Sequence, residues 1–486
     1  MSDVISLANQ IAAEKENIRQ AIENRGVSIP VTTPLTDYAA KIAAIDTENS
    51  ASDLYIKDPN FDPATVDLVI PGNYGVIADG AFENNTNLET IDFQYVNTIC
   101  DYAFENNTAL TTITANHLKY IGDDAFKGTT NLPSFSNTHI KWIGANAFEH
   151  SGIASVNVPN CEIVRSGAFM EADSLETVNI NSAHNIPAEC FYGCNILNSV
   201  SANLAKNIGP YAFYQAGNGA YTTYGTTYSL SFPEVESIGM YAFYDANGLV
   251  SISLPKCKSL SSYSFFGCNN LATVNAPKVT NVEFYTFNDT NAIYNLNLPE
   301  CLAIGNYNFF DNSHRITELT VADGCTIGDN CFKNGINKIN GKISKIGKNV
   351  YHNLNYSTTI DMDFSEITSI GDYSFSVNSS SYTINITSQM IDLANCTKIG
   401  TSNTQGYQSV FTNTANAGAA GKNNVKKIWL RKDCVFVANN SITFSMFNQA
   451  SCHIYTDAES KPAGWSNICT SATWHFGATH EEFEEA

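Results

Sequence analysis

Basic residues are scarce in this sequence. Lys and Arg together number 26, against 47 Asp and Glu, so the formal net charge is -21 at pH 7. Such a surplus of negative charge repels the phosphate backbone of nucleic acids and the headgroups of anionic lipids. We therefore expect neither nucleic acid nor membrane among the partners of this chain.

Long apolar runs are absent as well. No segment approaches the roughly 18 consecutive apolar residues that a membrane-spanning helix needs. The N-terminal segment MSDVISLANQIAAEKENIRQ has charges at Asp3, Glu14, Lys15 and Glu16 and no uninterrupted apolar stretch, so it does not resemble a signal peptide. We expect a soluble protein that is made in a cytoplasm.

Cysteine spacing gives no sign of a disulfide framework or a zinc site. The 13 cysteines are odd in number and scattered singly, apart from Cys190 and Cys194. Neither paired CxxC motifs nor an even set of spaced cysteines is visible. The expected state of these cysteines is a buried, reduced thiol that packs as a small apolar side chain.

Motifs for catalysis are also missing. The nine histidines form no HExxH motif, and no GxSxG, Walker-type or GxGxxG phrase is present. Adjacent carboxylates such as Asp123 and Asp124 could in principle hydrolyse glycosides. They occupy variable positions of a repeat, where charge usually faces solvent, so we expect no enzyme activity, no metal and no cofactor.

A repeat dominates the rest of the chain. Fourteen times, an apolar residue is followed five positions later by an aromatic residue, nearly always Phe. The pairs are Ile77/Phe82, Ile99/Phe104, Ile121/Phe126, Ile143/Phe148, Val164/Phe169, Ile186/Phe191, Ile208/Phe213, Ile238/Phe243, Leu260/Phe265, Val282/Phe287, Ile304/Phe309, Ile327/Phe332, Ile346/Tyr351 and Ile370/Phe375. Successive aromatic residues lie 22, 22, 22, 21, 22, 22, 30, 22, 22, 22, 23, 19 and 24 positions apart. This period lies in the leucine-rich-repeat range of about 20–29 residues.

A second phrase follows about six residues after each Phe, as in LETIDF from Leu88 and LETVNI from Leu175. Its fourth and sixth positions are apolar and its third and fifth are small and polar, which predicts a short half-buried strand. Stacked in register, the polar positions would form a ladder of hydroxyls and amides on one exposed sheet face. The candidate binding residues on this ladder are Thr112, Thr114, Thr177, Asn179, Asn295 and Asn297. The alternative is a ladder that is only hydrated.

The repeat predicts the fold class. One repeat cannot bury its own apolar face, so the Ile and Phe of each phrase must pack on those of the next. We expect a β-rich α/β solenoid, a leucine-rich repeat array of about 14–16 units. Gly122, Gly144, Gly209 and Gly239 suit a tight turn after the repeated Ile, and the Ala beside the Phe suits a crowded backbone.

The phrase IGxxAF followed by LxxVxL resembles the BspA-like leucine-rich repeat. The resemblance runs from about residue 67 to about residue 448. It implies a solenoid that binds partners rather than an enzyme, and in this family a Cys commonly follows the Phe by three residues, as Cys194 and Cys268 do here. The segment 449–486, with two tryptophans and an acidic tail, resembles the closing segment of such arrays and predicts a C-terminal cap.

The step of 30 residues carries an insertion, AGNGAYTTYGTTYSL. Its three tyrosines, Tyr221, Tyr224 and Tyr228, stand among Gly and Thr. Tyr is often used in binding loops because it offers a large contact area and has few rotatable bonds. This loop is a second candidate for binding a host surface; the alternative is a solvated loop whose tyrosines pack locally.

The first 46 residues differ from the repeat. Val4, Ala8, Ile11, Lys15, Ile18 and Ile22 recur at spacings of 4, 3, 4, 3 and 4, which predicts the apolar seam of an amphipathic helix. A second short helix is indicated after Thr36 and Asp37, and residues 47–66 are typical of a linker. Two short helices are marginal alone, so we expect a partner for Val4, Ala8, Ile11, Ile18 and Ile22. That partner is either the first repeat or another molecule.

The segment IRQAIENRGVSIPVTTPLTDYAAKIAAI resembles a helical module near the N-terminus of many bacteriophage structural and tail-fibre proteins. The resemblance implies a virion fibre or appendage protein that joins other virion proteins through these helices. It would be a homo-oligomer, trimer or dimer, and would present the array to host polysaccharide or protein. The alternatives are a bacterial or protist surface adhesin, the commoner setting of such repeats, and a purely structural scaffold.

Overall fold

The computed structural model describes residues 53–55, 62–219, 227–309, 316–351, 358–377, 384–400, 411–413, 425–436, 452–462, 465 and 472–485. The chain comprises two compact units, Met1–Ala183 and His184–Ala486. The helical seam predicted for Val4, Ala8, Ile11, Ile18 and Ile22, the phage-like module around it and most of the predicted linker lie outside the described residues.

Two sets of parallel strands alternate along the first unit. One set forms a six-stranded sheet in the order β1 (Asp53–Tyr55), β3 (Tyr74–Ile77), β5 (Thr98–Ile99), β7 (Tyr120–Ile121), β9 (Trp142–Ile143) and β11 (Ile163–Val164). The other set pairs as β2 (Asp67–Val69), β4 (Thr90–Asp92) and β6 (Thr112–Thr114), and again as β8 (Ser134–Ser136), β10 (Ser155–Asn157) and β12 (Thr177–Asn179). Each repeat therefore adds one strand to each set.

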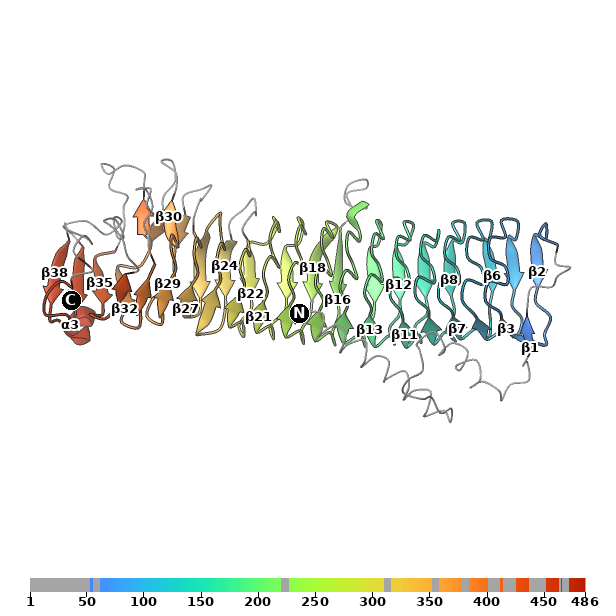
Figure 1. The fold of residues 1–486 in the computed structure, drawn as a ribbon, viewed down its shortest axis with the longest axis horizontal. Coiled ribbons are helices and arrows are strands. Elements are labelled where there is room, and N and C mark those ends of the chain that lie inside the picture. Colours follow the sequence, from blue (N-terminus) through green and yellow to red (C-terminus); the bar gives the residue numbers. More distant parts are fainter. Residues whose placement is uncertain are drawn as a thin grey trace, which may run out of the picture. The chain divides into compact units, whose positions relative to one another are not determined.

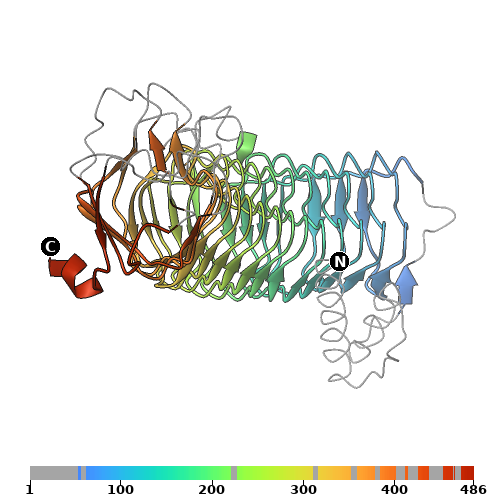
Figure 2. The same ribbon diagram turned by 60° about the vertical axis from the view of Figure 1, so that its left-hand side comes forward.

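The second unit continues the same pattern. Its long sheet has eleven strands, β13 (Asn185–Ile186), β15 (Asn207–Ile208), β17 (Ser237–Ile238), β19 (Ser259–Leu260), β21 (Asn281–Val282), β23 (Ala303–Ile304), β25 (Cys325–Ile327), β27 (Ile343–Ile346), β29 (Ser369–Ile370), β33 (Lys398–Ile399) and β36 (Val435–Phe436). The opposite set contains β14 (Ser199–Ser201), then β16 (Tyr228–Ser231), β18 (Leu249–Ser253) and β20 (Thr273–Asn275), then β22 (Asn295–Asn297), β24 (Ile316–Thr320) and β26 (Ile336–Asn340). Figure 1 shows strands of the long sheet, such as β13 and β21, along the lower edge of the turns and strands of the opposite set, such as β18 and β24, above them, and Figure 2 shows the successive turns of this unit.

Towards the C-terminus the repeat becomes less regular. Two small sheets pair β28 (Thr358–Ile360) with β31 (Ile384–Ile386), and β30 (Phe375–Val377) with β34 (Phe411–Asn413). A four-stranded sheet follows, formed by β32 (Met390–Leu393), β35 (Lys427–Leu430), β37 (His453–Thr456) and β38 (Thr473–Phe476). The short helix α3 (His480–Glu485) buries Phe483, whose ring lies 5.8 Å from Trp429 and 5.6 Å from Tyr455. That residues 449–486 act as a cap remains a prediction.

The core of each unit is the spine of aromatic rings that the period predicts. In the first unit, Phe82, Phe104, Phe126, Phe148 and Phe169 are fully buried, and neighbouring ring centroids are 5.1–5.6 Å apart. In the second unit, the same position gives a stack from Phe191 to Phe332 with spacings of 4.8–5.6 Å. Parallel pairing in register places equal positions of successive repeats over one another, so one sequence column becomes one stack.

The third side of each turn differs from the α/β expectation. Between the short strand and the next long strand, the backbone makes tight turns around the buried Phe instead of a helix, and among the described residues regular structure is almost entirely strand. These turns need left-handed residues two positions before and two after the Phe, such as Tyr102 and Asn106 around Phe104, with φ of 59° and 58°. Because left-handed residues recur four positions apart in this stretch, the backbone cannot continue as a right-handed helix there.

The repeated glycines serve close packing rather than an unusual turn. A Cβ atom on Gly144 would lie 2.3 Å from the carbonyl carbon of Gly122, and one on Gly122 would lie 2.6 Å from that of Cys100. Gly209 and Gly239 likewise approach backbone nitrogen atoms one turn back to 2.4 Å. The tight-turn explanation from the sequence is therefore corrected: at these positions the backbones of successive turns touch, and a side chain does not fit.

Candidate binding surface on the longer strands

The longer strands expose two columns of polar side chains in each unit, which we call the strand face. In a three-residue strand the outer side chains point away from the core and the central one points inwards. Val156 and Val178 are buried accordingly, whereas Thr112, Thr114 and Thr177 are exposed. The sequence prediction of a half-buried strand with a polar outer side is confirmed at these strands.

The columns are in register from turn to turn. In the first unit, Ser134, Ser155 and Thr177 pair along one column and Ser136, Asn157 and Asn179 along the other, and Thr90 pairs with Thr112. In the second unit, the paired sets are Ser229, Ser251 and Thr273; Ser231, Ser253 and Asn275; Asn295, Glu318 and Lys338; and Asn297, Thr320 and Asn340. A strand face of this kind repeats one hydrogen-bonding group at every turn.

Part of this hydrogen-bonding capacity is used within the columns. The Asn179 amide donates to Asn157 Oδ1 at 2.9 Å, and the Asn157 amide donates to Ser136 Oγ at 3.2 Å. In the second unit, the Ser251 hydroxyl donates to Ser229 Oγ at 2.6 Å. Because a hydroxyl or amide has several donor and acceptor sites, these contacts orient the side chains and still allow further bonds at the exposed side.

Most of the strand face carries no formal charge. Its acidic members in the first unit, Asp67 and Asp92, lie on β2 and β4, and Asp67 Oδ1 accepts a bond from the Thr90 hydroxyl at 2.5 Å. In the second unit, Glu318 accepts bonds from Asn340 at 2.6 Å and from Lys338 at 3.3 Å. These bonds lower the pKa of Glu318. The surface therefore favours neutral, hydroxyl-rich partners over strongly charged ones.

The structure places the candidate ladder residues as follows. Thr112 and Thr114 lie side by side on β6, and Thr177 and Asn179 lie on β12. Asn295 and Asn297 lie on β22 in the second unit. Five of these side chains are exposed and Asn179 is half-buried. Whether any of them binds a partner remains a prediction.

The predicted Tyr-rich loop is partly wrong. Tyr221 and Tyr224 lie outside the described residues, but Tyr228 is the first residue of β16 and only 6% exposed. Its hydroxyl donates to the carbonyl oxygen of Ala216 at 3.0 Å, and burial raises the pKa of the phenol. Tyr228 therefore cannot present its ring to a host surface.

The carboxylates considered for catalysis are held within the array. Arg165 donates from Nη1 to both oxygens of Asp123, at 2.7 and 2.8 Å, and Asp123 also accepts the Ala145 N–H at 2.7 Å. Asp124 is 3.3 Å from the Lys127 ammonium, and its pKa is raised because burial outweighs that contact. Asp123 thus joins its own turn to later ones, whereas Asp124 pairs within its own turn.

No cluster of three or more His, Cys, Asp or Glu suited to a metal ion occurs in the described part of the chain. None of the helices described there is long and apolar enough to cross a bilayer. None of the twelve described cysteines forms a disulfide, and all but Cys100 are buried, as the scattered spacing predicts. The Cys268 thiol, for example, lies 2.9 Å from the carbonyl oxygen of Phe243.

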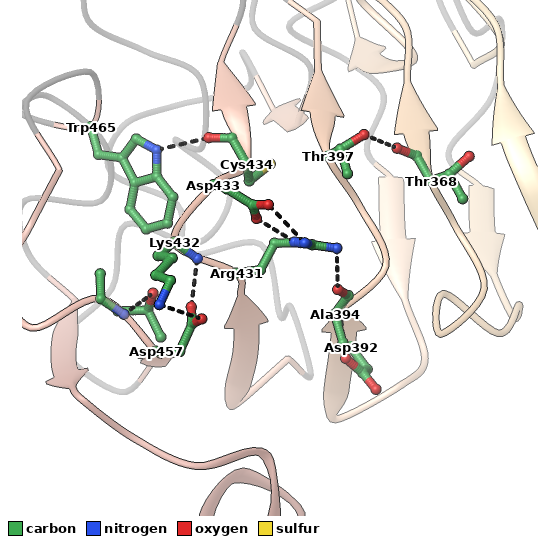
Figure 3. A network of polar contacts seen from close by, with 12 residues as sticks. Thr368, Asp392, Ala394, Thr397, Arg431, Lys432, Asp433, Cys434, Asp457 and Trp465 are labelled. Atoms are coloured by element: carbon green, nitrogen blue, oxygen red, sulfur yellow. Dashed lines mark hydrogen bonds and ion pairs between the residues drawn. The ribbon is translucent and has the colours of Figure 1, made fainter.

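A polar network near the C-terminus lies beside a pocket of about 330 Å³ lined by residues 432–436, Pro462 and Trp465. Figure 3 shows its bonds between successive turns. Arg431 binds the carboxylate of Asp433 and, from Nη1, the carbonyl of Ala394 at 3.4 Å, while Trp465 Nε1 donates to the Cys434 carbonyl at 3.2 Å. The guanidinium of Arg431 and the indole N–H of Trp465 are thus already bonded to groups of this chain. The network therefore joins turns of the chain to one another.

One surface was missed at the sequence level. In the second unit, tyrosines two residues before and one residue after the spine Phe stack into rows on the surface, for example Tyr241 on Tyr263 at 4.7 Å. The signal was available, because these tyrosines share the period of the Phe residues beside them.

Comparison with protein families gives a match to the BspA type leucine-rich repeat region, which covers residues 62–169, 97–220, 215–339 and 326–407. No curated protein matches the chain.

Several solved structures match this chain in part. A leucine-rich repeat protein from Bacteroides ovatus is 17% identical, with 63% of this chain and 86% of that chain covered and a TM-score of 0.34. A leucine-rich cell surface protein from Faecalibacterium prausnitzii is 14% identical, with 86% and 90% covered and a TM-score of 0.31. The pneumococcal vaccine antigen PcpA is 15% identical, with 88% and 83% covered and a TM-score of 0.25.

Proposed function

Because the chain belongs to the BspA-type leucine-rich repeat proteins, whose repeat model matches more than half of its length, we propose that it is a non-enzymatic recognition protein. It binds an extended, repeating partner along the strand face. The observation that carries this proposal is the register of exposed and half-buried hydroxyls and amides on consecutive strands, such as Thr90 opposite Thr112 and Ser136 opposite Asn157.

The spacing and chemistry of the strand face favour a neutral polysaccharide at a host surface. Neighbouring parallel strands are about 4.8 Å apart, so equivalent groups recur at short, regular steps along each unit. A polymer with hydroxyls on every sugar ring can form many weak hydrogen bonds with these repeated groups. Once one sugar is bound, the effective concentration of the next is high, so the linked weak contacts together give strong binding. The chain's formal net charge of -21 opposes strongly acidic polymers.

The absence of catalysis in this proposal is supported by the bonding of the candidate carboxylates. Asp123 is held by Arg165, and Asp124 by Lys127. A glycosidase needs one carboxylic acid and one carboxylate facing a common cleft, whereas these side chains are already paired with cations of the chain.

The setting that we propose is a virion. The N-terminal seam of Val4, Ala8, Ile11, Ile18 and Ile22 would attach the protein to other virion proteins and join copies as a trimer or dimer. Residues 449–486 would cover the last repeat as a cap. This part rests on the sequence alone. A bacterial or protist surface adhesin would use the same strand face. A structural scaffold would use neither the strand face nor the N-terminal seam for recognition.

The recognition proposal is tested with the full chain on an array of neutral and acidic polysaccharides. A variant with Thr112, Thr114 and Thr177 changed to Val keeps the side-chain shape and strand preference but removes three exposed hydroxyls. The matched control changes the same residues to Ser and keeps the hydroxyls. We expect binding to be lost in the Val variant and retained in the Ser control; no binding by the unmodified chain, or equal binding by the Val variant, contradicts the proposal.

The virion setting is tested separately by deleting residues 1–46 and measuring incorporation into particles and oligomeric mass. Incorporation should be lost and the oligomeric mass should fall, while binding to the polysaccharides should keep its selectivity. Unchanged mass and incorporation contradict the attachment role and leave the strand-face proposal standing.

A further inference from the structure

The second unit carries two rows of stacked aromatic rings on its surface. The first row, two residues before the spine Phe, has centroid spacings of 4.6–4.9 Å and interplanar angles of 2–11°. The second row, one residue after the Phe, has spacings of 4.8–5.0 Å and angles of 2–6°. The rows consist of Tyr211, Tyr241, Tyr263, Tyr285 and Tyr307, and of Tyr192, Tyr214, Tyr244 and Phe266. We call these nine residues the tyrosine face.

The two rows form one continuous surface. Rings of the two rows lie 5.7–5.8 Å apart on three successive turns, as between Tyr241 and Tyr244. All nine side chains are half-buried. Phe284, which is 46% exposed, extends the surface with its ring edge-on to Tyr263 at 5.8 Å.

The stacking limits what this surface can bind. Inside each row a ring has a neighbour on both faces, so the faces are not free to stack on a sugar ring. What remains accessible is a broad strip of ring edges and phenol groups. Such a strip suits contact with a flat protein surface, because Tyr is enriched at the centre of protein interfaces.

The backbone indicates that the rings have a role besides stabilising their own turns. All five tyrosines of the first row adopt left-handed backbone conformations, with φ of 57–59°. Bulky residues disfavour this conformation, and Asn tolerates it better. Other turns have Asn146 or Glu189 at the equivalent position, so the array does not require an aromatic ring there. The fold therefore does not require tyrosine with this strained backbone conformation at five successive turns.

The rings supply the centre of a protein contact. An aromatic side chain has about 150–250 Å² to bury, and nine half-buried rings keep about a quarter of that area exposed, on the order of 400 Å² in all. That is about half of the roughly 800 Å² that one partner buries in a standard protein interface, so exposed neighbours such as Phe284 supply the remainder.

We propose that the tyrosine face is the interface between two copies of this chain. A partner for these rows must repeat the same step of 4.6–5.0 Å over several turns, and a second tyrosine face has that step by construction. A twofold axis through the middle of the first row, at Tyr263, places Tyr241 of one copy opposite Tyr285 of the other, and Tyr211 opposite Tyr307. Each copy then contributes the same patch, as a twofold-symmetric dimer requires.

Charge opposes this contact and makes it salt-dependent. The charged groups that act on Tyr211, Tyr214 and Tyr244 are the carboxylates of Glu189, Asp245 and Asp289, which raise the pKa of these phenols after the larger effect of burial. Two copies bring like charges together, and salt screens them over about 8 Å at physiological ionic strength. Association should therefore strengthen as salt is added, whereas docking of a basic protein would weaken.

The experiment is analytical ultracentrifugation of the full chain over a range of protein and salt concentrations. The main variant changes Tyr241, Tyr263 and Tyr285 to Asn. The matched control is Tyr102→Asn, which changes a tyrosine with the same backbone conformation, φ of 59°, at an exposed position of the first unit. A second variant, Tyr263→Glu, places two carboxylates against each other at the twofold axis; the array already accepts Glu at the equivalent position of Glu189.

We expect the unmodified chain and the Tyr102→Asn control to double their mass in a step that salt strengthens. The Asn triple variant and Tyr263→Glu should weaken that step by at least about 100-fold, with circular dichroism and melting unchanged. If the triple variant loses its fold, two other measurements test the interface. One is the mass of the Tyr263→Glu variant, and the other is radical footprinting of the tyrosines in the unmodified chain at low and high concentration.

A chain without this doubling step, a Tyr263→Glu variant that doubles like the unmodified chain, or footprints that do not change with concentration overturn the proposal. The interface is independent of the strand face and of residues 1–46. Its failure therefore leaves the proposed function unaffected.

Discussion

The hydroxyl of Tyr228 donates a hydrogen bond to the backbone carbonyl oxygen of Ala216 across 3.0 Å, in the interior of the second unit. The ring fits against two glycines: a Cβ atom on Gly217 would lie 2.3 Å from Tyr228 Cε1, and one on Gly248 would lie 2.8 Å from it. The insertion between the seventh and eighth repeats thus ends in a buried, specifically bonded side chain.

The change Tyr228→Phe should destabilise the protein without affecting recognition. It keeps the ring but leaves the buried Ala216 carbonyl without this donor, which costs about 1–3 kcal/mol. The free energy of unfolding from urea titration measures the loss. Tyr95→Phe, at a side chain that is 55% exposed, is the control and should change stability by less than about 0.5 kcal/mol. Equal stability of Tyr228→Phe and the unmodified chain would show that the bond is not made.

The sequence predicted the spine and the strand register because both follow from the repeat length alone. When strands pair in parallel and in register, residues one repeat apart lie over one another, as Val156 over Val178. A step of 22 residues therefore places Phe on Phe without any knowledge of the turns between. The buried rings from Phe82 to Phe169 are the direct result.

The repeat length does not predict that Tyr228 is buried, because the insertion changes the spacing between repeats at this point. The local pattern does predict it: Tyr228 and Leu230 on β16 and Phe232 just after it alternate with Ser, and all three are buried. The Gly and Thr residues before Tyr228 are typical of an exposed loop, so the two patterns in this insertion predict opposite positions for its ring.

The sequence predicts the strand face but not the tyrosine face. Polar columns such as Thr177 and Asn179 were predicted because strand alternation fixes which side chains point outwards. The tyrosine rows share the period, but their stacking depends on left-handed backbone at Tyr241 and Tyr263. Composition and spacing do not reveal that conformation, since Tyr is a poor candidate for it.

Glycine at position 144 should be essential for close stacking of turns. In Gly144→Ala, the new Cβ meets backbone atoms of Gly122 and Asp123 at 2.3–2.5 Å, and backbone cannot move aside as a side chain can. We expect a loss of about 3 kcal/mol in urea titration. The control Gly72→Ala meets only the side chain of Tyr95, at 3.3 Å, and should be nearly neutral. Comparable losses in the two variants would contradict close backbone approach as the cause.

Removing one ring from the spine should weaken the turns beside it most. Phe126 is fully buried between Phe104 at 5.3 Å and Phe148 at 5.4 Å, so Phe126→Ala should cost about 3–5 kcal/mol. Repeats contact mainly their neighbours. Hydrogen exchange should therefore accelerate around residues 104–148 more than in the second unit. Val69→Ala, at a side chain 61% exposed, serves as control, and uniform acceleration along the chain would contradict a spine of local contacts.

Buried thiols should make the protein less stable in alkaline solution. Burial raises the pKa of the Cys161 thiol from 9.0 to about 12, so between these values the folded protein holds a proton that the unfolded chain has lost. This favours unfolding as pH rises through that window, by up to about 1.4 kcal/mol per pH unit, and has no effect below it. Urea titrations at pH 8, 9, 10 and 10.5 measure the slope for the unmodified chain and for Cys161→Ala. The variant should lose stability at every pH but decline less steeply above pH 9, because one titrating thiol is gone while the other groups remain. Parallel slopes would mean that Cys161 ionises alike in both states, and that its burial does not control its protonation.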